Sequence, residues 1–299
     1  MSTTGWTELS DFTPAALPIA LNQEIVGRAM EEGRAKQSWV LAFVVGTKPC
    51  FNKVYGAVAA CRRRGLPFFV IDAQQHFDAV LTHGLTEFSF TPHVGVNFQL
   101  RGDLVQKSAE LFYKTSRLAK WLRDNWPDVT VVPVVNGDTI LCPIIPAAWM
   151  FTRREKSIQN EAGLRAMSPN LFQNMPRDIA LDDFLGGQWD GDWHLLRTEP
   201  FPEQWDTFVS AAGCEHHMAP VELNREHLLR EGYPAENIYL TGGVVVDALE
   251  MKRQEKPAQS IFELYPRLAE GKWLRLDVHR KENLSRQRFT AIFGALERL

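Results

Sequence analysis

The sequence lacks the cysteine spacings that build metal or redox sites. Its four cysteines, Cys50, Cys61, Cys142 and Cys214, form no C-x-x-C pair and match no common zinc-binding spacing. Zinc ribbons and thioredoxin-like redox motifs are therefore excluded. We expect reduced, mostly buried thiols in a cytoplasmic protein that holds no metal.

The sequence also lacks an excess of positive or negative charge and has no long apolar run. The chain of 299 residues carries 33 Lys and Arg against 36 Asp and Glu, a net charge of −3, so no basic excess points to nucleic acid. No stretch approaches about 20 uninterrupted apolar residues, so we expect no membrane span. Residues 1–21 lack the basic start and apolar core of a secretory signal.

What the sequence does have is an alternation of strand-like and helix-like segments. The apolar runs at residues 38–45, 66–72 and 129–138 are typical of buried parallel strands. A helix is expected over 51–64, ended by Gly65, and another after Asp103 as its N-cap. The alternation predicts the α/β class, with a Rossmann-like, doubly wound parallel sheet.

Polar motifs follow three of the expected strands. They read G-T-K-P at 46–49, N-G-D-T at 136–139 and N-E-A-G-L-R at 160–165. Ligands of doubly wound sheets bind at the carboxyl ends of the strands. We therefore expect these three motifs to share one edge of the sheet and to form a binding site there.

Seven motifs in a fixed order carry a family resemblance. They are G-T-K-P-C (46–50) with Lys53, Q-H-F-D (75–78), N-G-D-T (136–139), E-A-G-L-R (161–165), P-E-Q (202–204), Gly242 and Gly243 with Asp247, and H-R-K-E-N (279–283). With them the chain resembles the UDP-N-acetylglucosamine 2-epimerases from about residue 39 to its C-terminus, which implies the glycosyltransferase-B-like fold. It departs from the family pattern at Lys48 (usually Arg), Cys50 (an acid), Asn136 (His), Thr207 (Arg) and Gly243 (Asn).

The resemblance implies that UDP-GlcNAc and UDP-ManNAc interconvert by elimination and re-addition of UDP, with no cofactor and no metal. Such chemistry needs carboxylates with separated pKa values for the two proton transfers, and cations beside the diphosphate. The implied catalytic residues are Asp138, Glu161, Glu203 and His279. The implied substrate-binding residues are Lys48, Lys53, His76, Arg165 and Arg280.

Structural alternatives stay open for several of these residues. Asp138 precedes Thr139 and could serve only as a helix cap. Lys53 could be a solvated surface lysine, and His76 could pack beside Phe77. The sequence leaves open which carboxylate is the base and which is the acid.

The domain expectation has four parts. Residues 1–37 form an N-terminal extension, and 38–251 form a Rossmann-like domain with an inserted loop or flap at 166–201. Residues 252–299 begin a second Rossmann-like domain that we expect to be truncated, because the family continues past H-R-K-E-N. Three explanations stay open: the chain is a fragment, it forms a homodimer or has a partner that completes the second domain, or it is a degenerate relative. A glycosyltransferase-like enzyme, or a non-catalytic sugar-nucleotide-binding relative, are the alternatives to an epimerase.

Overall fold

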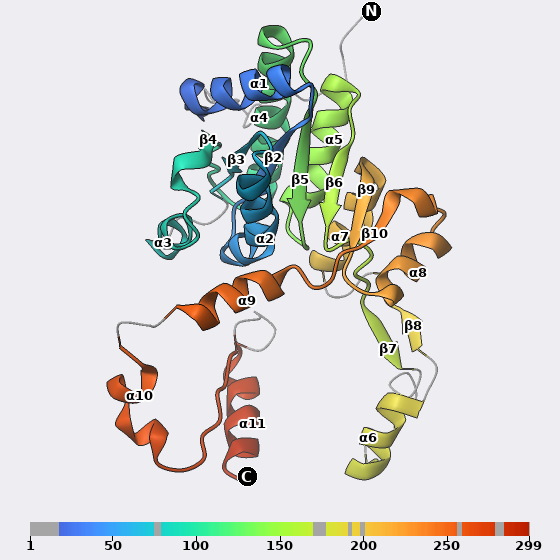
Figure 1. Cartoon of the computed structure of the whole chain (residues 1–299). Helices are drawn as coiled ribbons and strands as arrows, with labels where there is room; N and C mark the ends of the chain where they lie inside the picture. The colour runs from blue at the N-terminus through green and yellow to red at the C-terminus, as the bar shows by residue number, and fades with distance from the viewer. Residues whose placement is uncertain are drawn as a thin grey trace, which may run out of the picture. The chain divides into compact units, whose positions relative to one another are not determined.

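The structure, a computed structural model, describes residues 18–74, 79–169, 178–190, 193–197, 201–255, 259–278 and 284–298 (Figure 1). The chain divides into two compact units, Met1–Lys252 and Arg253–Leu299. Each unit is described by itself. That the second unit begins a Rossmann-like domain stays a prediction.

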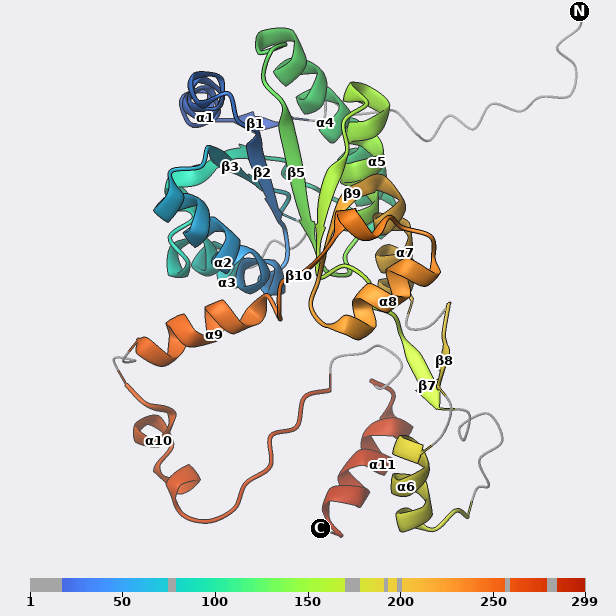
Figure 2. The same cartoon turned by 45° about the vertical axis from the view of Figure 1, so that its right-hand side comes forward.

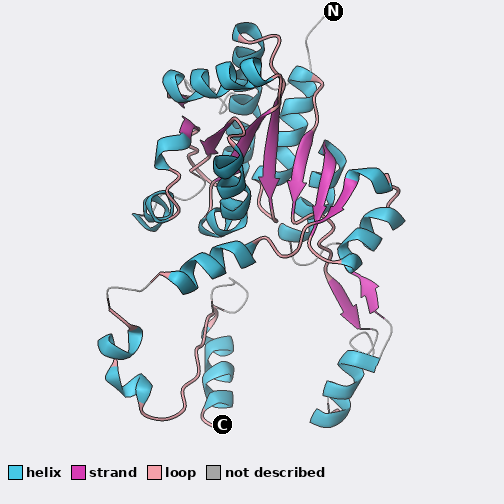
Figure 3. Cartoon of the chain, in the orientation of Figure 1, coloured by secondary structure: helices cyan, strands magenta, loops and turns pink. Residues whose placement is uncertain are grey.

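The first unit is built on an eight-stranded sheet in the order β1-β4-β3-β2-β5-β6-β9-β10. Figure 3 shows the strands in magenta, with helices around them. Every neighbouring pair is parallel except β1 with β4. This confirms the predicted α/β class with a mostly parallel sheet. The strands are β1 (Ala20–Leu21), β2 (Val40–Val45), β3 (Phe68–Asp72), β4 (Val94–Asn97), β5 (Val131–Asn136), β6 (Ser157–Asn160), β9 (Cys214–Ala219) and β10 (Ile238–Leu240).

Helices cover both faces of this sheet. They are α1 (Gln23–Lys36), α2 (Lys48–Arg64), α3 (Ala79–Glu87), α4 (Leu104–Asn125), α5 (Leu141–Arg153), α7 (Glu203–Gly213), α8 (Glu222–Arg230) and α9 (Val245–Gln254), with the short 3-10 helices η1 (Thr91–His93) and η3 (Ala235–Asn237). Strand β2 shows why both faces need cover. Its Val40, Ala42 and Val44 pack with α1, α4 and α5, whereas Phe43 and Val45 pack with α2.

The predicted helix ends are confirmed where the sequence carries a cap. The Asp103 carboxylate accepts a hydrogen bond from the backbone N–H of Gln106 at 2.9 Å, which caps α4. Gly65 ends α2 in the left-handed conformation with a φ of 60°. Helix α2 begins at Lys48, three residues before the predicted start at 51, because Pro49 fits its first turn.

The predicted insert at 166–201 contains regular structure where it is described. Strands β7 (Met167–Pro169) and β8 (Trp193–Leu195) pair antiparallel, and α6 (Leu181–Asp190) lies between them in the sequence (Figure 2). The second unit holds α10 (Ile261–Leu264), η4 (Pro266–Ala269) and α11 (Arg286–Leu296). None of its residues within 259–278 and 284–298 is buried. Within the described ranges, no helix combines the length and apolarity that a membrane crossing would need.

Candidate functional site

The three polar motifs meet at the carboxyl ends of β2, β5 and β6, as the sequence predicts. These strands are adjacent and parallel, β5 pairing with β2 on one side and with β6 on the other. Their exits therefore lie side by side. The G-T-K-P motif starts α2, N-G-D-T leads from β5 into α5, and N-E-A-G-L-R follows β6.

Two asparagines tie these strand ends together. The Asn160 side-chain amide donates to Asn136 Oδ1 at 2.8 Å and to the Lys53 carbonyl at 3.1 Å. Asn136 Nδ2 donates in turn to the Val44 carbonyl at 3.2 Å. Both side chains are buried, so these bonds satisfy polar groups that would otherwise be costly in the core. Asn136, where the family pattern has histidine, thus links β2, β5, β6 and α2.

Lys53 brings two of the predicted catalytic carboxylates together. Its ammonium lies 2.6 Å from Glu161 Oε2 and 3.7 Å from Asp138 Oδ1. The side chains of Lys53 and Glu161 are 16% and 13% exposed, whereas that of Asp138 is 45% exposed. Lys53 is therefore a mostly buried ion-pair partner of both acids, not a solvated surface lysine.

The charge of Lys53 is held by these neighbours. Burial acts to lower the pKa of Lys53, but the Glu161 and Asp138 carboxylates outweigh it and raise the pKa above its ordinary value. Lys53 consequently stays cationic across the physiological range. One positive charge is thus fixed between two carboxylates at the sheet edge.

The loop around this ion pair has little room for other side chains. Gly137 has a φ of 79°, and a Cβ there would collide with the Lys53 ammonium. Glu161 itself has a φ of 57°, which is unusual for a residue other than glycine. Its backbone N–H donates to Asn160 Oδ1 at 3.2 Å. The carboxylate that Lys53 holds is therefore presented on a strained backbone.

Helix α7 brings Glu203 and a fourth carboxylate, Asp206, which the sequence analysis missed. Asp206 is fully buried, and neither of its oxygens has a hydrogen-bond partner among the described residues. Burial raises the pKa of Asp206 to about 8, and the charges of Asp138 and Glu203 act in the same direction. The three-residue spacing of Glu203 and Asp206, which places them on one face of α7, can be read from the sequence, but the burial of Asp206 cannot.

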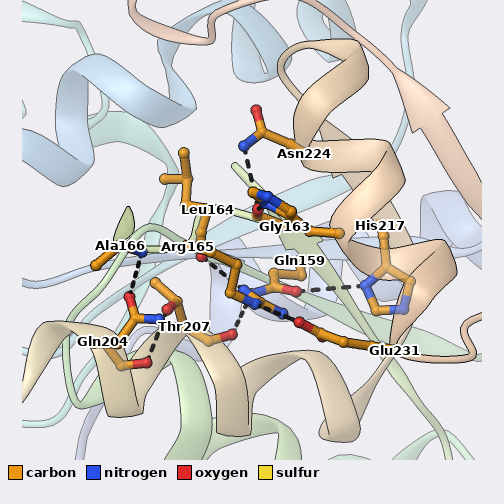
Figure 4. A network of polar contacts seen from close by, with 11 residues as sticks. Gln159, Gly163, Leu164, Arg165, Ala166, Gln204, Thr207, His217, Asn224 and Glu231 are labelled. Atoms are coloured by element: carbon orange, nitrogen blue, oxygen red, sulfur yellow. Dashed lines mark hydrogen bonds and ion pairs between the residues drawn. The ribbon is translucent and has the colours of Figure 1, made fainter. Parts of the chain in front are cut away.

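Side-chain amides anchor α7 against β6 and its loop (Figure 4). Gln204 Oε1 accepts from the Ala166 backbone N–H at 2.9 Å, and Gln159 Nε2 donates to the Thr207 carbonyl at 3.3 Å. The Thr207 hydroxyl donates to the Gln204 carbonyl at 2.9 Å. These contacts fix the helix turn that carries Glu203 and Asp206.

Arg165 is committed to contacts within the protein. Its guanidinium donates to both carboxylate oxygens of Glu231 at 2.7 and 2.6 Å and to the Leu164 carbonyl at 2.7 Å (Figure 4). The group is fully buried and lies 4.1 Å from the centre of the Phe208 ring. The structure thus places Arg165 as a link to α8, and substrate binding by this residue stays a prediction.

The remaining predicted residues divide into two groups. Lys48 is exposed at the first position of α2, where backbone N–H groups and the helix dipole favour anions. His76, His279 and Arg280 lie outside the described residues. In the ranges that the structure describes, no group of three His, Cys, Asp or Glu side chains is arranged to hold a metal ion.

All four cysteines are free and buried, as the sequence predicts. Cys142 lies beneath the site and donates to the Asn136 carbonyl at 3.0 Å. Burial raises the pKa of Cys142 to about 12, so it is a thiol and not a nucleophilic thiolate.

Comparison with known proteins agrees with this arrangement. The family model for UDP-N-acetylglucosamine 2-epimerase matches residues 196–299. A UDP-N-acetylglucosamine 2-epimerase of Salmonella typhimurium is 29% identical over 266 residues, covering 85% of this chain and 60% of that protein. The Escherichia coli K12 enzyme of the same name is 26% identical, covering 81% of this chain and 57% of that protein.

Solved structures show the same fold. The UDP-GlcNAc 2-epimerase of Neisseria meningitidis has a TM-score of 0.54 at 19% identity, covering 72% of this chain and 50% of that one. The Methanocaldococcus jannaschii enzyme has a TM-score of 0.53 at 17% identity, covering 86% and 62%. The chain spans about three fifths of the length of the Salmonella relative. The chain is thus similar to UDP-N-acetylglucosamine 2-epimerases in its ordered motifs, in the part that the family model matches and in its glycosyltransferase-B-like fold.

Proposed function

We propose that this protein is a sugar-nucleotide epimerase that interconverts UDP-GlcNAc and UDP-ManNAc. The observation that carries the proposal is the clustering of Asp138, Glu161 and Lys53 at the carboxyl edge of a parallel sheet. Helix α7 adds Glu203 and Asp206, and Asp206 lies within range of the charges of both Glu203 and Asp138. That edge is where sheets of this kind bind ligands.

The relatives support the choice of substrate. The Neisseria meningitidis structure is described as bound to UDP-GlcNAc, and a Methanocaldococcus jannaschii structure as a complex with UDP-GlcNAc and UDP. A diphosphate needs a local positive potential. Exposed Lys48 at the start of α2 supplies both a side-chain charge and a helix N-terminus.

The proposed reaction needs one base and one acid on opposite faces of the sugar. A carboxylate removes the proton from C2, the C1–O bond breaks, and UDP leaves with the electron pair as a C1=C2 double bond forms. Return of UDP to C1 and of a proton to the other face of C2 gives the epimer. Asp138, Glu161 and Glu203 are the candidates for these two roles, and their assignment stays open.

We also propose that the protein works in the cytoplasm. All four cysteines are free in the structure, including Cys61, whose pKa burial raises to about 11. A full set of unpaired thiols is typical of proteins that fold under reducing conditions.

The test is to incubate the protein with UDP-GlcNAc in deuterated water and follow the sugar by NMR. We expect UDP-ManNAc to form and deuterium to enter at C2. Asp138→Asn and Glu161→Gln are expected to lower kcat by at least about 100-fold, the scale of one proton-transfer group. Asp124→Asn serves as the control, because Asp124 is exposed on α4, and it should leave kcat unchanged.

Two results would contradict the proposal. Transfer of the sugar without deuterium at C2 would favour a glycosyltransferase-like enzyme. Binding of UDP-GlcNAc with neither label nor transfer would favour a non-catalytic relative.

A further inference from the structure

Asp206 is a buried acid to which the proposed reaction assigns no role. It lies in the first turn of α7, with its side chain fully buried. Neither carboxyl oxygen accepts a hydrogen bond from any described residue. Buried polar groups are almost always paired, so an unpaired buried carboxyl indicates either a protonated acid or a functional role.

The surroundings of Asp206 do not compensate a negative charge. The titratable groups that face it are Glu203 on its own helix, Asp138 from the loop between β5 and α5, and the Cys142 thiol on α5. Two of these are acids and the third is a neutral thiol. Lys53, the cation of this site, is paired with Glu161 and Asp138. A third negative charge, fully buried beside these two acids, is strongly disfavoured.

Geometry also connects Asp206 to the reacting edge. Glu203 and Asp206 are three residues apart on α7, so their side chains lie on the same face of the helix. The turn that bears them is fixed against β6 and its loop through Gln204 and Thr207 (Figure 4). A proton on Asp206 is therefore held close to Glu203 in a constant geometry.

We propose that Asp206 is the proton store of this site, a resident carboxylic acid that shares its proton with Glu203 and Asp138. This inference rests on the proposed epimerase function. In each turnover one carboxylate gains the C2 proton, and another gives a proton to the opposite face of C2. The group that has given its proton takes the proton of Asp206. The proton gained by the base returns to Asp206, directly or by exchange with water, so the number of protons in the cluster is unchanged after a full cycle.

Asp206 acts through its neighbours, so it is a positioning residue and not a group that touches the sugar. With its proton in place, the cluster carries one negative charge fewer when the anionic diphosphate arrives. An amide of the same shape would keep the charge balance but has no proton to give. That difference separates a proton store from a merely neutral packing group.

The first test measures the proton itself in the full chain without substrate. Infrared spectra are recorded in deuterated water with 13C-labelled aspartate, for the unmodified protein, Asp206→Asn and the control Asp124→Asn. We expect a protonated-carboxyl band at neutral pH that titrates with a midpoint near pH 8, is absent from Asp206→Asn and is unchanged in Asp124→Asn. An ionised Asp206 at pH 7 would overturn the inference. The titration of the unmodified protein decides this point even if Asp206→Asn fails to fold.

The second test measures use of the proton. The pH profile of kcat for UDP-GlcNAc epimerisation is compared between the unmodified protein and Asp206→Asn. We expect Asp206→Asn to be slower by at least about tenfold and to lose the alkaline limb that Asp206 produces. An unchanged rate and profile in a folded Asp206→Asn would overturn the inference and leave the epimerase standing. If Asp206 titrates as expected but the protein never introduces deuterium at C2 of the sugar, the protonated state of Asp206 is supported and the proposed epimerase function is wrong. Failure of the inference and failure of the proposed function therefore give different results.

Discussion

At the scale of single residues, the site depends on an acid presented by an unfavourable backbone. Glu161 follows β6 with a φ of 57°, and its carboxylate contacts the Lys53 ammonium at 2.6 Å. A residue with a Cβ pays for such a conformation, whereas glycine does not. The backbone conformation of Glu161 therefore lowers the stability of the fold at this position, and backbone strain of this kind is found at functional sites.

This backbone strain predicts which of two substitutions of Glu161 gives the more stable protein. Both Glu161→Ala and Glu161→Gly remove the carboxylate, so both should abolish C2 exchange. Glu161→Gly should nevertheless be the more stable of the two by about 1 kcal/mol, because only glycine relieves the left-handed backbone. Urea unfolding of the two variants measures the difference. Equal stability, or a more stable alanine variant, would show that the backbone at this position is not strained.

Asp206 gives a second prediction at this scale, for stability against pH. Its pKa is about 8 in the folded protein, against an ordinary value near 4 when unfolded. Between pH 4 and pH 8 only the folded state keeps the proton on Asp206. The contribution of Asp206 to the unfolding free energy is therefore full below pH 4, falls as the pH rises and is lost above pH 8. The unfolding free energy of the unmodified protein should thus fall relative to Asp206→Asn by up to about 1.4 kcal/mol per pH unit in this window. Parallel curves for the two proteins from pH 5 to 8 would contradict this.

At the scale of elements, some strands could be predicted from the sequence and others could not. The strands β2, β3 and β5 were visible because they are nearly continuous apolar runs. Strand β9 was not, because its sequence, Cys-Glu-His-His-Met-Ala, carries polar side chains. His217 on this strand is buried, and its Nδ1 lies 3.4 Å from Gln159 Oε1, so the polarity is satisfied in the interior. No local pattern predicts a strand whose polar groups find their partners only in the folded sheet.

The candidate site shows the same division. Asp138, Glu161 and Lys53 were predicted from their motifs, and strand pairing then brought them together. Asp206 belongs to no motif, and only the fold shows that its side chain is buried beside Glu203 and Asp138. Burial of a single helix position depends on what packs against it, which the sequence does not state.

The link between β6 and α8 predicts where Arg165 acts. Glu231→Gln would leave the fully buried Arg165 guanidinium without its carboxylate. We expect a loss of about 3 kcal/mol in unfolding free energy, the scale for breaking a buried ion pair from one side. The affinity for UDP-GlcNAc of the folded variant should stay the same, as measured by calorimetry. Reduced affinity at unchanged stability would instead favour the substrate-binding role that the family resemblance implies.

At the scale of the whole molecule, the two units differ in how well they bury their residues. The first encloses apolar clusters on both faces of its sheet. The second buries none of the residues described in 259–278 and 284–298, and its exposed side chains include Trp273, Leu274 and Phe293. A segment of this kind lacks the apolar burial that stabilises an independent core.

Hydrogen exchange should reveal this difference. Amides of α10 and α11 are expected to exchange within seconds, whereas those of β2 and β5 stay protected for hours, because protection follows burial and cooperative structure. Mass spectrometry of peptides from the full chain measures both. If the amides of α11 are as well protected as those of β5, the expectation is wrong and the second unit is stabilised in a way that the burial of its described residues does not show.

The asparagine pair at the strand ends has a last consequence. Asn136 and Asn160 hold β2, β5, β6 and α2 in register through amide groups, and amides neither gain nor lose protons in the range where proteins are folded. A histidine at position 136 would change its charge near neutrality. The contacts between these strand ends are accordingly made by groups that do not titrate, so a change of pH leaves this part of the frame as it is.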